Sequence, residues 1–246
     1  MLERLTDAHC HLSGRAPDSL PPRGVEACAA CACFAGEWGE LDGISRASVK
    51  KVYGLHPDAG ISALDDVGFA EKQIFSALLP ELERRLASAD AVGEIGLDAR
   101  ITERVPLEMQ KRVFAAQLEI ARARGLPAVI HCVGEWGALR EILRGFFSAD
   151  SGAGFLIHAA SCSAEVAASL EKLGARFSFG VRELSSRRGA ECAARVGSDR
   201  IMVETDGDCS AASLENAAAA LAAVRSASAV EIADAAFENF RSFYSK

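Results

Sequence analysis

The chain has 246 residues, of which 50% are hydrophobic and 25% charged, so it can build a large core and is not an intrinsically disordered protein. Lysine and arginine number 27 against 34 acidic residues, a net charge of −7, which excludes proteins that bind polyanions through an overall positive charge. The length alone is compatible with one or two domains.

Short apolar segments alternate with longer amphipathic or alanine-rich segments along the whole chain, a pattern typical of βα units around a parallel sheet. The predicted strands are Leu5–His9, Glu26–Phe34, Lys51–Leu55, Ala91–Ile95, Pro127–His131, Gly154–His158, Arg176–Phe179 and Arg200–Glu204. Eight such units predict an α/β fold, a single (β/α)8 TIM-type barrel. Because no segment resembles a linker, we expect one domain over residues 1–246.

Long helices are predicted where apolar residues recur at spacings of three and four. Two such segments are Phe69–Ala89 and Leu107–Arg124. Near the end of the chain, Ser228 and Glu231 form a capping box that opens a last helix extending to Phe243. We expect this last helix to pack on the outside of the barrel.

The first twelve residues, MLERLTDAHCHL, include acidic and histidine residues where a secretory signal needs a long apolar segment, and no run of about 18 apolar residues occurs anywhere. We therefore expect a cytoplasmic protein without membrane association, with its eight cysteines reduced. Cys28, Cys31 and Cys33 lie close in sequence, but a structural zinc site needs four ligands. We interpret these three cysteines as small apolar residues of the second strand and its surroundings.

All five histidines of the chain lie at or just after the end of a predicted strand. In a (β/α)8 barrel the carboxyl ends of the strands meet at one face, where they surround one pocket. Because neutral imidazole is the commonest metal ligand, this coincidence favours a metal site over five unrelated core residues. The histidines are His9, His11, His56, His131 and His158.

His9 and His11 are two residues apart on an extended strand, so both side chains can reach one ion. Asp7 precedes them, and a carboxylate at this position can orient an imidazole. An H-x-H pattern alone is a weak signal, and it gains weight only from the acidic residues that follow other strands.

Two carboxylates complete the candidate site. Glu94 lies among apolar residues and glycines in the fourth strand, where a carboxylate needs a partner, and Asp206 follows the eighth strand. We expect Asp206, rather than Glu204, to point into the site. The six candidate metal ligands permit two divalent ions bridged by Glu94, with zinc, manganese or iron better suited than magnesium to the imidazoles. These ligands are His9, His11, Glu94, His131, His158 and Asp206.

The chain resembles the TatD family of metal-dependent deoxyribonucleases, within the amidohydrolase-like barrels. The segments DAHCHL, GLHP, VGEIGLD, LPAVIH, IHAAS and VETD follow the family's order and approximate spacing, and VGEIGLD is the most specific of them. The resemblance implies one ion at His9, His11, Glu94 and Asp206 and another at Glu94, His131 and His158. It also implies cleavage of DNA phosphodiesters, often from the 3′ end, with His56 near the substrate phosphate.

Several positions depart from the family's pattern on the substrate side. Asp58 stands where members usually carry histidine, Val133 and Gly134 where they carry arginine, and Gly207-Asp208 where they carry Ala-Pro. Additional acids and lost cations disfavour tight binding of a polyanion, so we expect weak affinity for DNA.

The leading interpretation is a deoxyribonuclease that uses two metal ions and an activated water, with Glu94 and Asp206 as its catalytic carboxylates and Asp206 as the general base. The alternative is an amidohydrolase or lactonase that acts on a small molecule with the same metals. A third possibility is a barrel that only binds a partner. We expect a monomer or a small homo-oligomer.

Arg182, Arg187 and Arg188 face either the pocket or solvent, and the sequence leaves both possibilities open.

Overall fold

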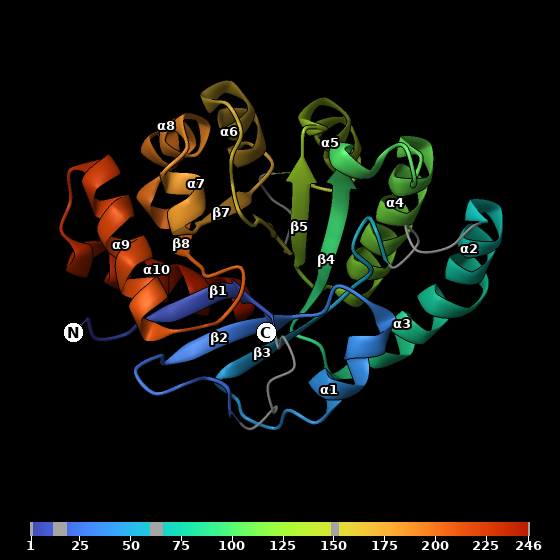
Figure 1. The fold of residues 1–246 in the computed structure, drawn as a ribbon, viewed down its shortest axis with the longest axis horizontal. Helices are drawn as coiled ribbons and strands as arrows, with labels where there is room; N and C mark the ends of the chain where they lie inside the picture. Colours follow the sequence, from blue (N-terminus) through green and yellow to red (C-terminus); the bar gives the residue numbers. More distant parts are fainter. Residues whose placement is uncertain (1, 12–18, 60–65, 149–152, 246) are drawn as a thin grey trace.

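Eight parallel strands form one sheet in chain order, from β1 to β8, in the computed structural model (Figure 1). The structure describes residues 2–11, 19–59, 66–148 and 153–245, so Leu12 of the first histidine motif lies outside the described residues. The strands are β1 Thr6–Cys10, β2 Ala27–Cys31, β3 Val49–Tyr53, β4 Ala91–Asp98, β5 Ala128–Val133, β6 Phe155–Ile157, β7 Ala175–Phe179 and β8 Ile201–Val203. Each predicted strand overlaps an observed one, and the predicted (β/α)8 barrel is confirmed.

The barrel closes between β8 and β1 through loop and side-chain contacts, because these two strands share no hydrogen-bonded ladder in the described residues. The backbone N–H of Asp206 donates to the carbonyl of His9 (3.1 Å). The buried Asp7 carboxylate accepts from the backbone N–H (3.0 Å) and the hydroxyl (2.7 Å) of Thr205. Asp7 therefore joins the two strand ends, and the expectation that it orients an imidazole is wrong.

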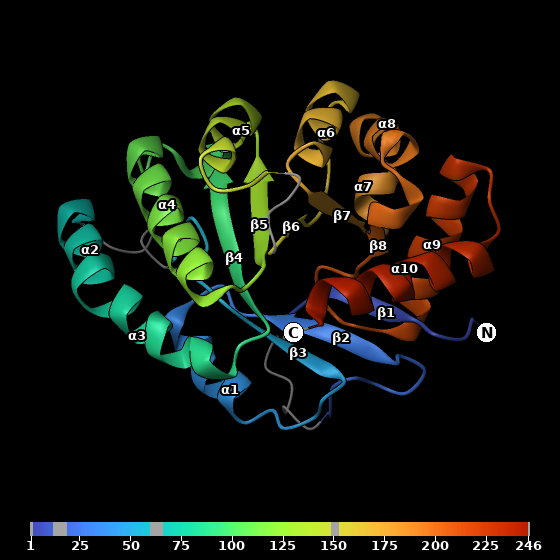
Figure 2. The same ribbon diagram turned by 180° about the vertical axis from the view of Figure 1, so that it is seen from behind.

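Figures 1 and 2 show helices α2 to α9 following one another around the outside of the strands. The helices are α1 Trp38–Asp42, α2 Val67–Gln73, α3 Leu79–Arg85, α4 Leu107–Arg124, α5 Trp136–Arg144, α6 Ala164–Glu171, α7 Val181–Leu184, α8 Arg187–Arg195, α9 Ala211–Arg225 and α10 Ala229–Tyr244. A π-helical turn, Ile74–Leu78, joins α2 to α3, so the helix predicted at Phe69–Ala89 is interrupted. The predicted helix Leu107–Arg124 is confirmed at both ends.

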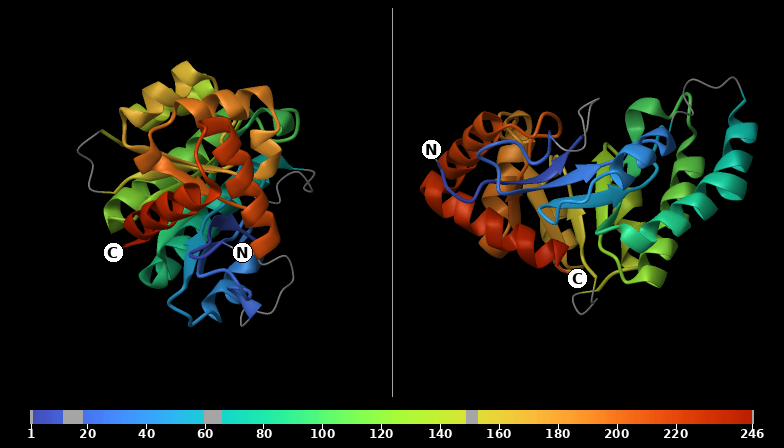
Figure 3. Two further views of the ribbon diagram at one scale, coloured as in Figure 1. Left: turned by 90° about the vertical axis from the view of Figure 1, so that its left-hand side faces the viewer. Right: turned by 90° about the horizontal axis from the view of Figure 1, so that it is seen from below.

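Helix α10 begins at the predicted capping box of Ser228 and Glu231 but does more than cover the outside of the barrel. Its side chains Phe240, Phe243 and Tyr244 pack against the inner residues of seven strands, and the Tyr244 hydroxyl donates to the carbonyl of Ala8 (3.0 Å). Those strand residues precede the histidines, so α10 closes the end of the barrel opposite the candidate site. Figure 3 shows the helix beside β1 in two further orientations. The sequence failed to predict this because the aromatic residues fall in the last turns of an ordinary amphipathic pattern.

No helix in the described part of the chain is long and apolar enough to cross a membrane.

Candidate metal centre

The predicted histidines and carboxylates converge on one cavity of about 650 Å³ at the carboxyl ends of the strands. This volume is within the range of about 300 to 1,000 Å³ usual for ligand pockets. His9 lies fully buried directly behind the cavity wall. The other predicted site residues line the cavity: His11, His56, Glu94, His131, His158 and Asp206.

One group of donors surrounds the Oε2 atom of Glu94. The Nε2 atoms of His9 and His11 lie 3.5 and 3.8 Å from this oxygen and 3.2 Å from each other. Asp206 Oδ1 completes the group at 3.6 Å from His9 Nε2 and 3.4 Å from His11 Nε2. Three elements distant in sequence thus place four donor atoms around one point.

A second group surrounds the other carboxylate oxygen of Glu94. His131 Nδ1 and His158 Nε2 each lie 2.7 Å from Glu94 Oε1 and 3.2 Å from each other. Each carboxylate oxygen of Glu94 therefore faces a different pair of imidazole nitrogens, and the two pairs adjoin, because the rings of His9 and His158 stack with centroids 4.0 Å apart.

The donor set has the chemistry that a divalent metal ion requires. The Nδ1 atom of His11 lies 3.0 Å from the carbonyl of Cys31, which fixes the proton on Nδ1 and leaves the lone pair of Nε2 for an ion. His9 Nε2 faces His11 Nε2 at 3.2 Å, and His131 Nδ1 faces His158 Nε2 at the same distance. If neither nitrogen of a pair carries a proton, the two cannot form a hydrogen bond with each other. A cation between them would then satisfy both lone pairs. The residues therefore fit divalent metal ions of the kinds that accept nitrogen and oxygen ligands.

The carboxylates and imidazoles of the centre shift one another's pKa values. Burial alone would raise the pKa of Glu94, but His158, His131 and His9 outweigh it and hold that pKa well below its usual range. Burial alone would lower the pKa of His11, but Asp206 and Glu94 raise it to about 9. Without metal, the site is a network of anionic carboxylates and partly protonated imidazoles.

The glycines of the VGEIGLD segment let β4 approach β5 closely at the site. Gly96 has a φ of +152°, and a Cβ at this position would lie 1.9 Å from the carbonyl oxygen of His131. Only glycine fits this position, because any side chain would displace the strand that carries His131. The segment thus has a packing role in addition to supplying Glu94.

Two acidic residues that the sequence did not assign to the site lie next to its histidines. Glu204 is buried and lies 3.8 Å from His158 Nδ1, where it also accepts from the backbone N–H of Ala159 (2.7 Å). Asp98 Oδ2 lies 3.2 Å from His131 Nε2. Glu204 and Asp98 each follow an apolar segment of the sequence, as Asp206 does. This position was the only feature of the sequence that indicated a place for them near the site.

His56 adjoins the second group, because a ring nitrogen of His56 and donor atoms of Glu94 and His131 all lie within 4.8 Å of one another. Its Nε2 is 3.8 Å from Glu94 Oε1, and its Nδ1 accepts from the backbone N–H of Asp58 (3.2 Å). Burial lowers the pKa of His56 to about 4, despite the opposing charge of Glu94. The imidazole is therefore neutral at pH 7, and its Nε2–H points toward the centre.

The cavity wall carries more positive charge than the sequence suggested. Arg100, Arg182 and Arg188 line it, together with Trp136, Val133 and Gly134. Neither Asp58 nor Asp208 is among the described residues that line the cavity, so the expected repulsion of phosphates by these acids is not supported. Arg187 instead pairs with Glu191 (2.8 Å) and does not line the cavity.

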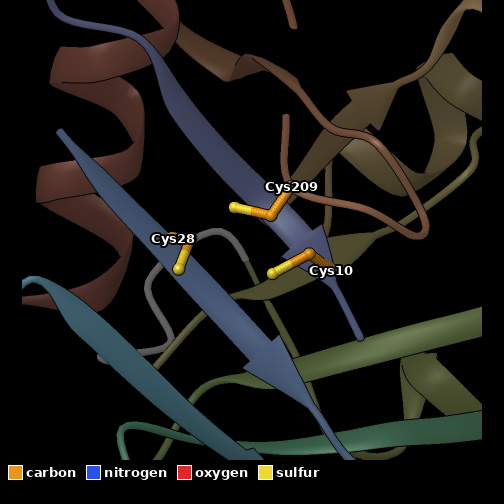
Figure 4. Close-up of side chains that lie close together, drawn as sticks. All are labelled: Cys10, Cys28 and Cys209. Carbon is orange, nitrogen blue, oxygen red and sulfur yellow. The ribbon is translucent and has the colours of Figure 1, made fainter. Parts of the chain in front are cut away.

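The cysteines separate into different environments. Cys28 lies with Cys10 and Cys209 in a buried cluster whose sulfur atoms are within 4.8 Å of one another and turn toward one another in Figure 4. Cys31 packs in the barrel interior, as expected for an apolar residue. Cys33 differs from this expectation, because it lines the cavity and its thiol donates to Glu94 Oε2 (3.4 Å).

Comparisons with known proteins agree with the barrel fold. The chain is 32% identical over 121 residues to the uncharacterized metal-dependent hydrolase YabD of Bacillus subtilis, an alignment that covers 47% of this chain and only 45% of YabD. The structure is similar to YJJV, a TatD homologue from Escherichia coli, with a TM-score of 0.77, 23% identity and coverage of 99% and 98% of the two chains. It is also similar to an uncharacterized amidohydrolase from Saccharomyces cerevisiae, with a TM-score of 0.75, 15% identity and coverage of 99% and 100%.

The family model described as TatD related DNase matches residues 6–245, which is nearly the whole sequence. The chain therefore belongs to the family of TatD related DNases.

Proposed function

We propose that this chain is a metal-dependent hydrolase that cleaves phosphodiester bonds in DNA, with two divalent ions held by its histidine and carboxylate cluster. The observation that carries the proposal is the position of Glu94, whose two carboxylate oxygens each face a different pair of imidazole nitrogens. Bound there, two ions would activate a water molecule and neutralise the charge of a phosphate. Membership of the TatD related DNases and the similarity to the metal-dependent hydrolase YabD support the same chemistry.

The chain's own residues divide the remaining work. His9, His11 and Asp206 would hold one ion and His131 and His158 the other, with Glu94 shared. Asp206 would take the proton of the attacking water as general base, a role supported by its position in the cavity lining. The neutral His56 would donate its Nε2–H to a phosphate oxygen.

A cleavage assay tests this function. Manganese-loaded protein should shorten a labelled single-stranded oligonucleotide, and a chelator should abolish the reaction. Glu94→Gln should be inactive, whereas Glu108→Gln, a control at an exposed carboxylate of α4 outside the cavity, should match the unmodified protein. Metal-dependent hydrolysis of amides or lactones without cleavage of DNA would favour the alternative activity of small-molecule amidohydrolases.

A further inference from the structure

Three arginines from separate segments line the cavity that holds the metal-ligand candidates. Arg100 follows β4, Arg182 lies in α7 and Arg188 in α8, and all three line the same cavity. The side chains of Arg100 and Arg182 are 66% and 74% exposed, so a ligand in the cavity can reach their guanidinium groups.

Carboxylates hold two of these arginines along one edge and leave the other edge available. Arg100 donates from Nε to Asp98 Oδ1 (2.9 Å), and Arg182 donates from Nη2 to Asp206 Oδ2 (3.0 Å) and from Nε to Glu183 Oε1 (2.7 Å). Within the described part of the chain, the Nη1 group of each arginine has no partner. A guanidinium fixed in this way binds an anion with little further loss of side-chain entropy.

Arg188 differs from its neighbour in sequence. It forms no ion pair or hydrogen bond with any described residue, although it lines the cavity, whereas Arg187 pairs with Glu191 outside it. Because the described residues offer Arg188 no partner, its guanidinium group is available to a ligand in the cavity.

We propose that Arg100, Arg182 and Arg188 form an anion subsite that binds a second phosphate group of the substrate, next to the phosphate at the metal centre; this inference rests on the proposed function. One guanidinium fork satisfies a carboxylate, which has two oxygens. Three guanidinium groups are better matched by a terminal phosphate, which has three oxygens and a charge close to −2 at pH 7. The subsite therefore favours short nucleotide ends that carry a terminal phosphate.

Kinetics with manganese-loaded protein test this subsite. The substrates are thymidylyl-thymidine with and without a 5′-phosphate, so that only one of them offers a second phosphate. We expect the phosphorylated dinucleotide to have a KM lower by about tenfold, the effect of one charge-assisted hydrogen bond. In Arg188→Gln this KM ratio should fall toward one, and in the matched control Arg187→Gln it should not change. An equal KM for both substrates in the unmodified protein, or an unchanged ratio in Arg188→Gln and in the double variant Arg100→Gln/Arg188→Gln, would overturn the proposal.

A binding measurement separates this inference from the proposed function. Thymidine 3′,5′-bisphosphate contains no phosphodiester, so calorimetry can measure its affinity for manganese-loaded protein even if no DNA is cleaved. Weaker binding by Arg188→Gln than by Arg187→Gln would support the subsite even if the proposed activity failed. If Arg188→Gln instead impaired only the hydrolysis of a cyclic amide that carries a carboxylate, the anion would be a carboxylate and the phosphate assignment would be wrong.

Discussion

Metal binding at this centre should displace protons and should therefore strengthen as the pH rises. Asp206 and Glu94 outweigh the effect of burial and raise the pKa of His11 to about 9, so this imidazole is protonated at pH 7 in the metal-free protein. A metal ion binds only the unprotonated ring. The proton on His11 must leave before Nε2 can act as a ligand. Below pH 9 protonation of this imidazole therefore competes with binding of the metal ion.

The pKa of His11 sets the size of this effect. For a single competing proton, apparent affinity changes about tenfold per pH unit below the pKa, which gives about tenfold between pH 7 and pH 8 and about fiftyfold between pH 7 and pH 9. The pKa of His158 is also raised, because Glu94 and Glu204 outweigh its burial, so its proton adds to the dependence. His56, with a pKa lowered to about 4, should contribute nothing in this range.

Calorimetric titration of the metal-free protein with manganese, in two buffers of different ionisation enthalpy, measures both quantities. We expect release of at least about one proton per chain at pH 7 and a clear gain in affinity by pH 9. Equal affinity at pH 7 and pH 9 with no proton release at pH 7 would refute the assignment of His11 as a ligand with a raised pKa.

Three further predictions concern single substitutions. Asp206→Asn should lower the rate of DNA cleavage by about 10²- to 10⁴-fold, because the amide cannot accept a proton; cleavage at a normal rate would exclude Asp206 as the base. Glu204→Gln should weaken metal binding by about 10- to 100-fold, since it loses the charge that faces His158, and a titration that gives an unchanged affinity would contradict this positioning role. Gly96→Ala should lower the free energy of unfolding in urea by about 3 kcal/mol or more, because the new Cβ would collide with the carbonyl of His131. A decrease of less than about 1 kcal/mol would show that β4 and β5 can move apart at this position.

The barrel and the meeting point of the histidines could be predicted because both depend on local sequence patterns. Each βα unit is visible in the alternation of apolar and amphipathic segments, and the topology then brings the strand ends together. His9 and His158 could thus be assigned to one site although their segments lie about 150 residues apart.

The contacts across the barrel could not be read from the sequence in the same way. The pairing of Asp7 with Thr205 and the contact of Glu204 with His158 depend on which strand ends become neighbours and on side-chain direction at irregular positions. Asp206 itself has a positive φ of 49°, outside any strand pattern. The arginines of the cavity wall lie in short helical segments that carry no ligand motif, so only the folded chain shows which of them face the site.

Bridging of two metal ions by Glu94 is the feature on which the proposed chemistry depends, and anomalous diffraction from crystals of manganese-loaded protein tests it most directly. We predict two peaks on opposite sides of the Glu94 carboxylate, one within ligand distance of His9, His11 and Asp206 and the other of His131 and His158. A single peak at the centre, or manganese bound only elsewhere, would contradict the bridging role of Glu94.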